Sequence, residues 1–153
     1  MKIDARFSTC RRYRYALWRV WDETRPQVVI IGLNPSRADA VRNNPTINRC
    51  IAFAQSWGYG GVCLANLFAF KAGTPSELMR AEDPVGPDND SWLLDIAATA
   101  DTVVAAWGND GAYRGRSAEV RRMIPNLCAL RINKSGEPAH PLYLKGSLVP
   151  VPW

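Results

Sequence analysis

The sequence predicts an α/β domain in which helices cover both faces of a central four-stranded parallel sheet, with one more antiparallel strand at the N-terminal side. Two observations predict this class. Apolar runs of the kind found in strands buried on both faces recur along the chain, and segments with helical periodicity separate them. The 153 residues suffice for one domain with a sizeable core, so we expect residues 1–153 to form a single domain.

The strands are predicted from continuous apolar sequence. The four parallel ones are expected at residues 27–32, 61–67, 101–108 and 126–132. Residues 13–21 (YRYALWRVW) are rich in Tyr, Trp and Val, which favours a strand over a helix. Because a turn at residues 22–26 separates this segment from 27–32, we expect the two to form a hairpin, with the N-terminal strand antiparallel.

Three helices are predicted between the strands. Thr46 is expected to cap the first, which ends at Gly58. The second covers residues 88–100 and opens with acidic and capping residues. The third covers residues 112–124, where Pro125 ends it. Right-handed crossovers would then place helices on both faces of the sheet.

The segments that follow the parallel strands are the expected location of function, because ligands of open α/β sheets bind beyond the carboxyl ends of the strands. Four such segments should converge on one cleft: GLNPSRAD, NLFAF, WGNDGAYRGR and NKSGEPAHP.

The net charge of +5 is concentrated in the first 25 residues, which carry seven basic and three acidic side chains. A basic segment interleaved with Tyr and Trp can follow a phosphate backbone and stack on bases. It is equally typical of a solvated edge strand whose arginines prevent aggregation, and both interpretations stay open. The expected contacts to phosphate or nucleic acid are Arg11, Arg12, Arg14, Arg49, Arg114 and Lys134.

Several classes of partner are not expected. No apolar run approaches the ~20 residues of a membrane helix, and the N-terminus lacks the apolar stretch of a signal peptide, so a cytoplasmic protein without a membrane partner is predicted. The four cysteines form no CxxC pair. We therefore expect reduced, mostly buried thiols, no metal site and no cofactor.

Seven segments follow one another from about Cys10 to the C-terminus: RRYRYALWRVWD, GLNPSRADAVRNNPTINRC, WGYGG, NLFAFKAGTPSEL, DPVGPDND, VVAAWGNDG and GEPAHPLYL. Together they resemble the DUF1643 family of bacterial proteins, a family name that carries no established activity. One position departs from the family pattern. Asn43-Asn44-Pro45-Thr46 stands where the family usually has Asp-Asp-Pro-Thr, which would alter any chemistry that needs those acids.

Three of the same segments carry a more distant resemblance. Gly32-Leu33-Asn34-Pro35-Ser36 is similar to the Gly-x-Asn-Pro-Gly motif of the uracil-DNA glycosylase superfamily, and Asn66 resembles its base-recognising Asn. His140-Pro141-Leu142 is similar to its His-Pro-Ser motif. The resemblance implies a uracil-DNA-glycosylase-like fold and cleavage of an N-glycosidic bond.

The implied catalytic residues are Asn34, whose carboxamide would hold a water, and His140, which would donate to the departing base oxyanion. Asn66 would read the edge of the base with adjacent donor and acceptor atoms. An aromatic platform is expected from Phe68 or Trp107. The complete base or substrate site is expected to contain Gly32, Leu33, Pro35, Ser36, Asn66, Phe68 and Trp107.

Each of these residues also has a structural interpretation. Asn34 before a proline is typical of a turn, Asn66 can hydrogen-bond its own loop, and His140 can be a surface residue. The resemblance also has two departures: Leu142 replaces the serine of the second motif, and Ser36 replaces the closing glycine of the first.

The leading hypothesis is binding of a nucleobase, nucleotide or nucleic acid with N-glycosidic hydrolysis. One alternative is a hydrolase or transferase that acts on free nucleotides through a polar ring of Asp39, Asn43, Asn44 and Arg49. The other is a nucleic-acid-binding module without catalysis, whose affinity would fall steeply as salt rises.

Overall fold

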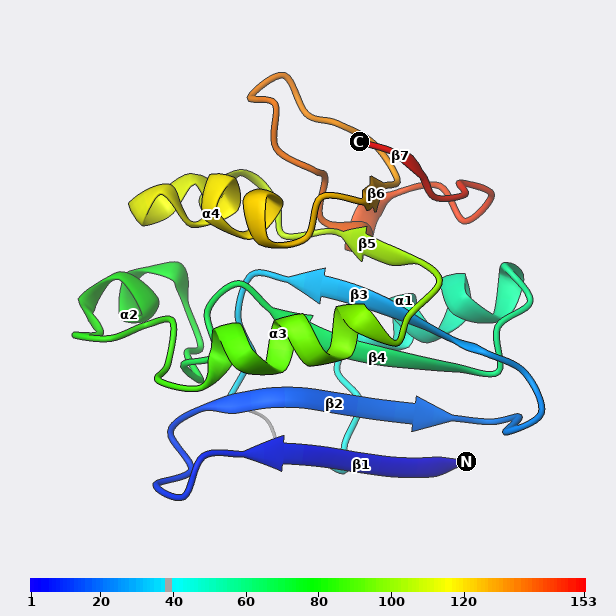
Figure 1. Ribbon diagram of the computed structural model, residues 1–153, viewed down its shortest axis with the longest axis horizontal. Helices are drawn as coiled ribbons and strands as arrows, with labels where there is room; N and C mark the ends of the chain where they lie inside the picture. The colour runs from blue at the N-terminus through cyan, green and yellow to red at the C-terminus, as the bar shows by residue number, and fades with distance from the viewer. Residues whose placement is uncertain (38–39) are drawn as a thin grey trace.

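The computed structural model describes residues 1–37 and 40–153, and in this part of the chain seven strands form one mixed sheet (Figure 1). The strands are β1 (Lys2–Phe7), β2 (Arg14–Val20), β3 (Gln27–Gly32), β4 (Gly61–Asn66), β5 (Val103–Ala105), β6 (Leu127–Ala129) and β7 (Val151–Pro152). Their order across the sheet is β1-β2-β4-β3-β5-β6-β7.

The α/β class is confirmed, whereas the predicted composition of the sheet is right only in part. Strands β4, β3, β5 and β6 pair in parallel as expected. Three antiparallel strands, not one, complete the sheet, because β1 pairs with β2, β2 with β4, and β7 with β6. The sequence of β1 is polar and exposed and β7 has only two residues, so neither produces an apolar run.

The predicted hairpin between residues 13–21 and 27–32 is wrong. Leu17 in β2 lies opposite Leu64 in β4, so β4 separates β2 from β3. The residues of β4 are buried or half-buried, and the strand therefore belongs inside the sheet, between β2 and β3.

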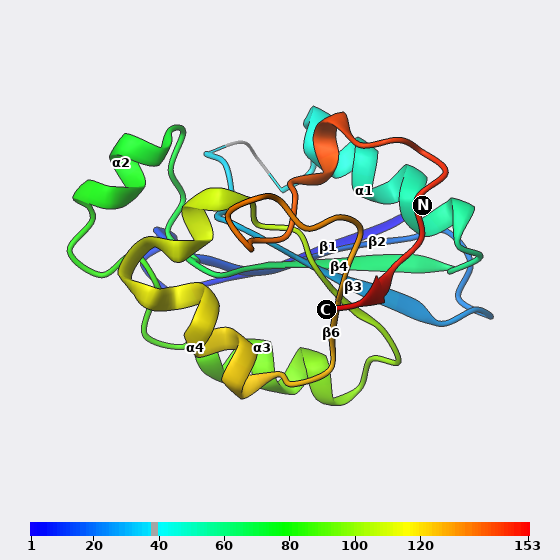
Figure 2. The ribbon, with the colours of Figure 1, turned by 90° about the horizontal axis from the view of Figure 1, so that it is seen from above.

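The helices lie on both faces of the sheet. They are α1 (Pro45–Ser56), α2 (Pro75–Arg80), α3 (Asn89–Ala98) and α4 (Arg116–Met123), with 3₁₀ turns η1 (Asn109–Gly115) and η2 (Pro141–Tyr143). Figure 2 shows α1 on one face and α3 and α4 on the other. Alternate residues of β3 follow this division: Val28 and Ile30 pack with α1, and Val29 and Ile31 with the cluster that includes residues of α3 and α4.

The helix boundaries differ from the predicted ones for local reasons. The N-cap of α1 is Asn44, not Thr46, because the Asn44 Oδ1 accepts from the Ile47 N–H at 2.8 Å. Helix α4 begins at Arg116, not at 112, because Arg114 has a φ of +55° and interrupts the helical path. Helix α2 was not predicted, although Thr74 caps it through the Glu77 N–H.

A bulge at the β1 end of the sheet reorients the start of β2. Arg6 lies opposite Ala16, but Phe7 lies opposite Arg14, so Tyr15 is an extra residue in β2. The ring of Tyr15 stacks on Trp92 of α3, whereas Arg14 lines a cavity together with residues of α1. A regular alternation along residues 13–21 would place Tyr15 on the same face as Leu17 and Arg19, and the bulge moves it to the opposite face.

Gly111 in η1 gives a test of packing next to the parallel strands. A Cβ at this position would lie 2.1 Å from Cδ1 of Trp107, which is 1% exposed and cannot move aside. We expect Gly111→Ala to lower the free energy of unfolding by about 1–3 kcal/mol in urea denaturation. At exposed Gly146 the nearest atom is 3.8 Å away, so Gly146→Ala should stay within about 0.5 kcal/mol of wild type. Equal effects of the two substitutions would contradict the packing of Trp107.

Candidate functional site

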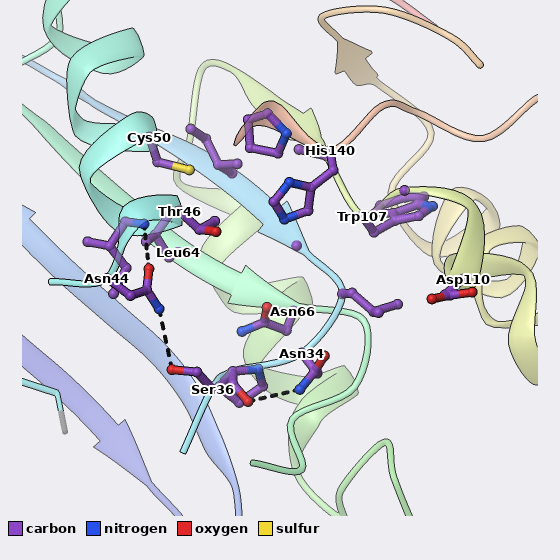
Figure 3. A pocket seen from close by; sticks show the side chains of 18 of the residues that line it. Asn34, Ser36, Asn44, Thr46, Cys50, Leu64, Asn66, Trp107, Asp110 and His140 are labelled. Carbon is purple, nitrogen blue, oxygen red and sulfur yellow. Dashed lines mark hydrogen bonds between the residues drawn. The ribbon is translucent and has the colours of Figure 1, made fainter. Parts of the chain in front are cut away.

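A cavity of about 610 Å³ opens at the carboxyl ends of the parallel strands (Figure 3). All four segments expected to converge contribute to its lining, together with the start of α1. The predicted catalytic and base-site residues that line it are Gly32, Leu33, Asn34, Pro35, Ser36, Asn66, Trp107 and His140, and the predicted phosphate contact Arg14 lines it as well. The structure thus brings together the three motifs that the sequence placed at separate strand ends.

Asn34 presents an oriented oxygen to this cavity. Its Nδ2 donates to the carbonyl oxygens of Pro35 at 2.9 Å and Ala72 at 3.1 Å. Both hydrogen bonds fix the amide group, and no residue of the described chain donates to its Oδ1. Asn34 therefore has two roles. Its Nδ2 stabilises the turn, as expected for an Asn-Pro pair, and its Oδ1 is an acceptor in the cavity.

Asn66 ends β4 with a side-chain amide that hydrogen-bonds to none of the described residues. The side chain is half-buried and lines the cavity. It lies close to Gly32, where a Cβ would be 3.1 Å from the Asn66 Oδ1, so glycine leaves the amide room beside β3. Both the donor and the acceptor of Asn66 can therefore serve a ligand.

His140 presents a donor. Its Nδ1 accepts from the Leu142 N–H at 3.2 Å, which leaves the proton of the neutral ring on Nε2. Desolvation of the ring lowers the pKa of His140 even though the residue as a whole is exposed, so the neutral form predominates at pH 7. Figure 3 shows the imidazole projecting into the same space as Asn34 and Asn66.

Two contacts hold the His140 segment over the strand ends. The Gly108 N–H donates to the Pro138 oxygen at 2.9 Å, and the Arg49 guanidinium donates to the Leu144 oxygen. Arg49, predicted as a phosphate contact, does not line the cavity, and its Cζ lies 4.7 Å from the centre of the Phe53 ring. It supports the loop that carries His140.

Neither predicted aromatic platform offers an open ring face. Phe68 is fully buried among core residues and packs against Tyr113, so its assignment to the base site is wrong. Trp107 does line the cavity, but it is only 1% exposed and packs edge-on against Trp153 at 5.6 Å. A ring at the end of a strand can point into the core or into the cleft, and the sequence does not distinguish the two.

The predicted phosphate contacts fall into two groups. Arg14 is 5% exposed and lines the cavity, so it does not share an exposed basic surface with Arg11 and Arg12, while its contact to phosphate stays a prediction. Arg11, Arg12, Arg114 and Lys134 are exposed and lie outside the cavity lining. Asp39 of the predicted polar ring lies outside the described residues, and Asn43 accepts from buried Arg19 at 2.9 Å.

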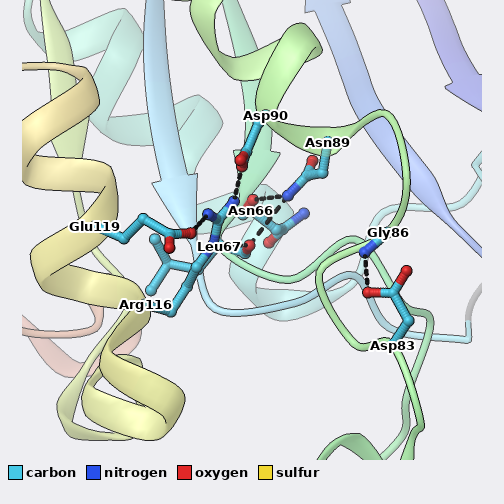
Figure 4. Close-up of polar contacts among 8 residues, drawn as sticks. All are labelled: Asn66, Leu67, Asp83, Gly86, Asn89, Asp90, Arg116 and Glu119. Atoms are coloured by element: carbon cyan, nitrogen blue, oxygen red, sulfur yellow. Dashed lines mark hydrogen bonds and ion pairs between the residues drawn. The ribbon is translucent and has the colours of Figure 1, made fainter.

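A buried network fixes the end of β4, as Figure 4 shows. Asn89, which is fully buried, donates from Nδ2 to the carbonyl oxygens of Asn66 and Leu67, each at 3.0 Å. Buried Arg116 donates from Nε to the Leu67 oxygen at 2.9 Å and pairs with Asp90 and Glu119. Asn66 is the last residue of β4 and Leu67 is the next one. The side chains of Asn89 and Arg116 supply the hydrogen-bond donors that a neighbouring strand would otherwise give to these two carbonyls.

Asn44 of the predicted polar ring does line the cavity. Among the lining residues that sequence reasoning did not assign to a site are Thr46, Cys50 and Asp110. Thr46 and Cys50 belong to α1, which the strand-end rule does not include. Asp110 lies in the segment WGNDG, whose position after a strand was the available signal. Burial raises the pKa of the Cys50 thiol to about 12, so it is protonated.

The described residues contain no group of three or more His, Cys, Asp or Glu side chains arranged to hold a metal ion. Within the same part of the chain, no helix has the length and apolar character needed to cross a bilayer.

The fold and cavity define an α/β protein with a polar site at the carboxyl ends of parallel strands. Residues 14–142 match the family described as "Protein of unknown function (DUF1643)", and the chain belongs to that family. No curated protein and no solved structure matches the chain.

The first prediction from the site concerns the network at the end of β4. Asn89→Ala would leave the Asn66 and Leu67 oxygens without their amide donor, so we expect a loss of about 1–3 kcal/mol in the free energy of unfolding. Urea denaturation measures it. Asn48→Ala, at an exposed position of α1, should change stability by less than about 0.5 kcal/mol. An Asn89→Ala protein as stable as Asn48→Ala would show that the network does not hold the strand end.

The second prediction concerns His140, the single histidine of the chain. Because burial disfavours the charged imidazole, His140 should become protonated at a lower pH in the folded protein than in the unfolded chain. The contribution of His140 to the free energy of unfolding is therefore complete above the unfolded pKa of 6.5 and is lost as pH falls through the folded pKa. An NMR titration of the one histidine should give a midpoint below 6.5, and the same signal in urea is the control. A folded midpoint at or above the urea value would contradict this environment.

Proposed function

We propose that the cavity binds a nucleobase and that the protein hydrolyses the N-glycosidic bond between this base and its sugar. The observation that carries the proposal is the convergence of Asn34, Asn66 and His140 in one cavity. Their unpaired atoms differ, since Asn34 offers an acceptor, His140 a donor, and Asn66 both.

The proposed chemistry assigns one task to each group. The Asn34 Oδ1 accepts from a water, which attacks the anomeric carbon of the sugar as the bond to the base breaks. The electron pair leaves with the base, where a carbonyl oxygen takes the negative charge and accepts from Nε2–H of His140. The proton of the attacking water passes to solvent. A neutral histidine suits this donor role, and the lowered pKa of His140 supports it.

Asn66 would select the base. A carboxamide matches a base edge that has a donor next to an acceptor. A site built to hydrogen-bond a polar edge rejects a ligand without that edge, because its own buried groups would be left unpaired. Gly32 supports this role, since its missing side chain leaves room for the Asn66 amide.

We further propose that the domain has the arrangement of the uracil-DNA glycosylase superfamily. Support comes from the order of the three motifs along the chain and from the positions of Asn34, two residues beyond β3, and Asn66, the last residue of β4. Helices on both faces of four parallel strands are consistent with that arrangement.

The test is incubation with oligonucleotides and nucleosides that carry uracil, mismatched or modified bases, read as released base and abasic sites. His140→Ala should lower the rate about 10²–10³-fold by analogy with other preorganised donors. Asn34→Ala should lower the rate and spare ligand affinity, while Asn66→Ala should change which base is accepted.

Asn48→Ala serves as the matched control because this exposed side chain is outside the cavity. Thermal melting shows that each variant is folded. Wild-type protein that binds nucleobases but releases none from any substrate would overturn the hydrolase and leave a binding site.

A further inference from the structure

We propose that one end of the cavity is a phosphate subsite, built by the buried guanidinium of Arg14 and the first turn of α1. The inference rests on the proposed function, because it extends a nucleobase site to a site for phosphorylated ligands. The phosphate would belong to the same nucleotide whose base contacts Asn66.

Arg14 is the first observation. Its side chain lines the cavity and is 5% exposed, and its buried Nη1 has no hydrogen-bond partner among the described residues. Burial, and secondarily the charge of Arg19, lower the pKa of Arg14 to about 10, so the side chain keeps its charge at neutral pH. A buried charge without a partner is costly, and an anion in the cavity would remove this cost.

The other buried arginines of the described chain show that Arg14 is an exception. Arg19 donates to the Asn43 Oδ1 and to the Ala40 oxygen. Arg116 pairs with Asp90 and Glu119. No carboxylate of the described residues pairs with Arg14. The one acidic residue in the cavity lining is Asp110, and Figure 3 shows it on the side of the cavity opposite Asn44 and Thr46.

The first turn of α1 is the second observation. The Ile47 N–H donates to the Asn44 side chain, and the Asn48 N–H donates to the Asn44 carbonyl. Pro45 has no N–H. Thr46 is the remaining residue of the turn, and neither its N–H nor its hydroxyl has a partner among the described residues. Thr46 lines the cavity, and no acidic side chain lies in this turn.

These donors suit a phosphate better than a carboxylate. A guanidinium, a backbone N–H and a hydroxyl can bind several oxygens of a tetrahedral anion at once. The positive end of the twelve-residue helix α1 adds to the attraction. The volume of about 610 Å³ lies within the usual range for small-molecule sites, so a phosphate and a base can occupy it together.

Inorganic phosphate is the direct probe, titrated by calorimetry and followed as a rise in melting temperature. Arg14→Met should weaken phosphate binding about 10- to 100-fold, because it removes a charge-assisted donor of similar length. Asn44→Asp keeps a capping oxygen but adds a negative charge at the same turn, and should weaken binding to a similar extent. Arg122→Gln, a change of an exposed arginine of α4 outside the cavity, should leave binding unchanged.

Stability separates the subsite from a structural role of Arg14. Since Arg14 is unpaired, Arg14→Met should leave the phosphate-free protein as stable as wild type or more stable, and phosphate should no longer stabilise it. Wild-type protein that does not bind millimolar phosphate, or a folded Arg14→Met protein that binds it like wild type, would overturn the subsite.

The source of the phosphate is tested with ligands that carry one base. A nucleoside, its 5′-monophosphate and a short oligonucleotide are compared on wild type and Arg14→Met. If the monophosphate binds more tightly than the nucleoside and this difference depends on Arg14, the ligand is a free nucleotide. If only the oligonucleotide binds more tightly, the phosphate belongs to a strand. Equal affinity of all three ligands contradicts the proposal.

Phosphate binding through Arg14 without release of any base would overturn the hydrolase alone. Base release that does not depend on Arg14 or phosphate would overturn the subsite alone.

Discussion

The carbonyl oxygens at the end of β4 set the geometry of the whole cleft. Asn66 and Leu67 turn their carbonyls away from the sheet ladder and toward the interior, where Asn89 and Arg116 donate to them. A buried carbonyl without a donor costs about 1–3 kcal/mol, so the strand can end here only because α3 and α4 supply these side chains. The backbone of Asn66 is therefore held by helices on the face of the sheet opposite α1, while its side-chain amide makes no hydrogen bond to the described residues.

Buried charge has two different uses in this fold. Arg116 is fully compensated by Asp90, Glu119 and a carbonyl, which makes it a rigid structural contact. Arg14 is equally removed from solvent, but no described residue compensates it. Removing a charge from water weakens the folded state, and the same removal strengthens attraction to an anion that enters the cavity. The cost of the unpaired cation and the affinity that we propose for a phosphate therefore have the same physical origin.

The strand-end rule predicted the site better than the sequence predicted the sheet. Apolar runs gave β3 and β4 almost to the residue, and Asn34, Asn66 and His140 then followed as neighbours from topology alone. The position of β4 between β2 and β3 depends on pairing between distant segments, which local pattern does not contain. Arg14 was misplaced because the one extra residue at Tyr15 reverses the sides to which alternating residues point.

The hydrogen bonds already made by the site define what a ligand must offer. Asn34 has used both donors on backbone carbonyls, so its free oxygen requires a donor such as water. His140 has used its acceptor on the Leu142 N–H, so its free Nε2–H requires an acceptor. Asn66 has used neither and requires a group with both. In the proposed function, a nucleobase that carries a carbonyl beside an N–H would satisfy His140 and Asn66 together and leave Asn34 for a water. Because hydrogen bonds orient Asn34 and His140 before a ligand arrives, these two side chains need little reorganisation on binding, which is the condition under which such groups are most effective.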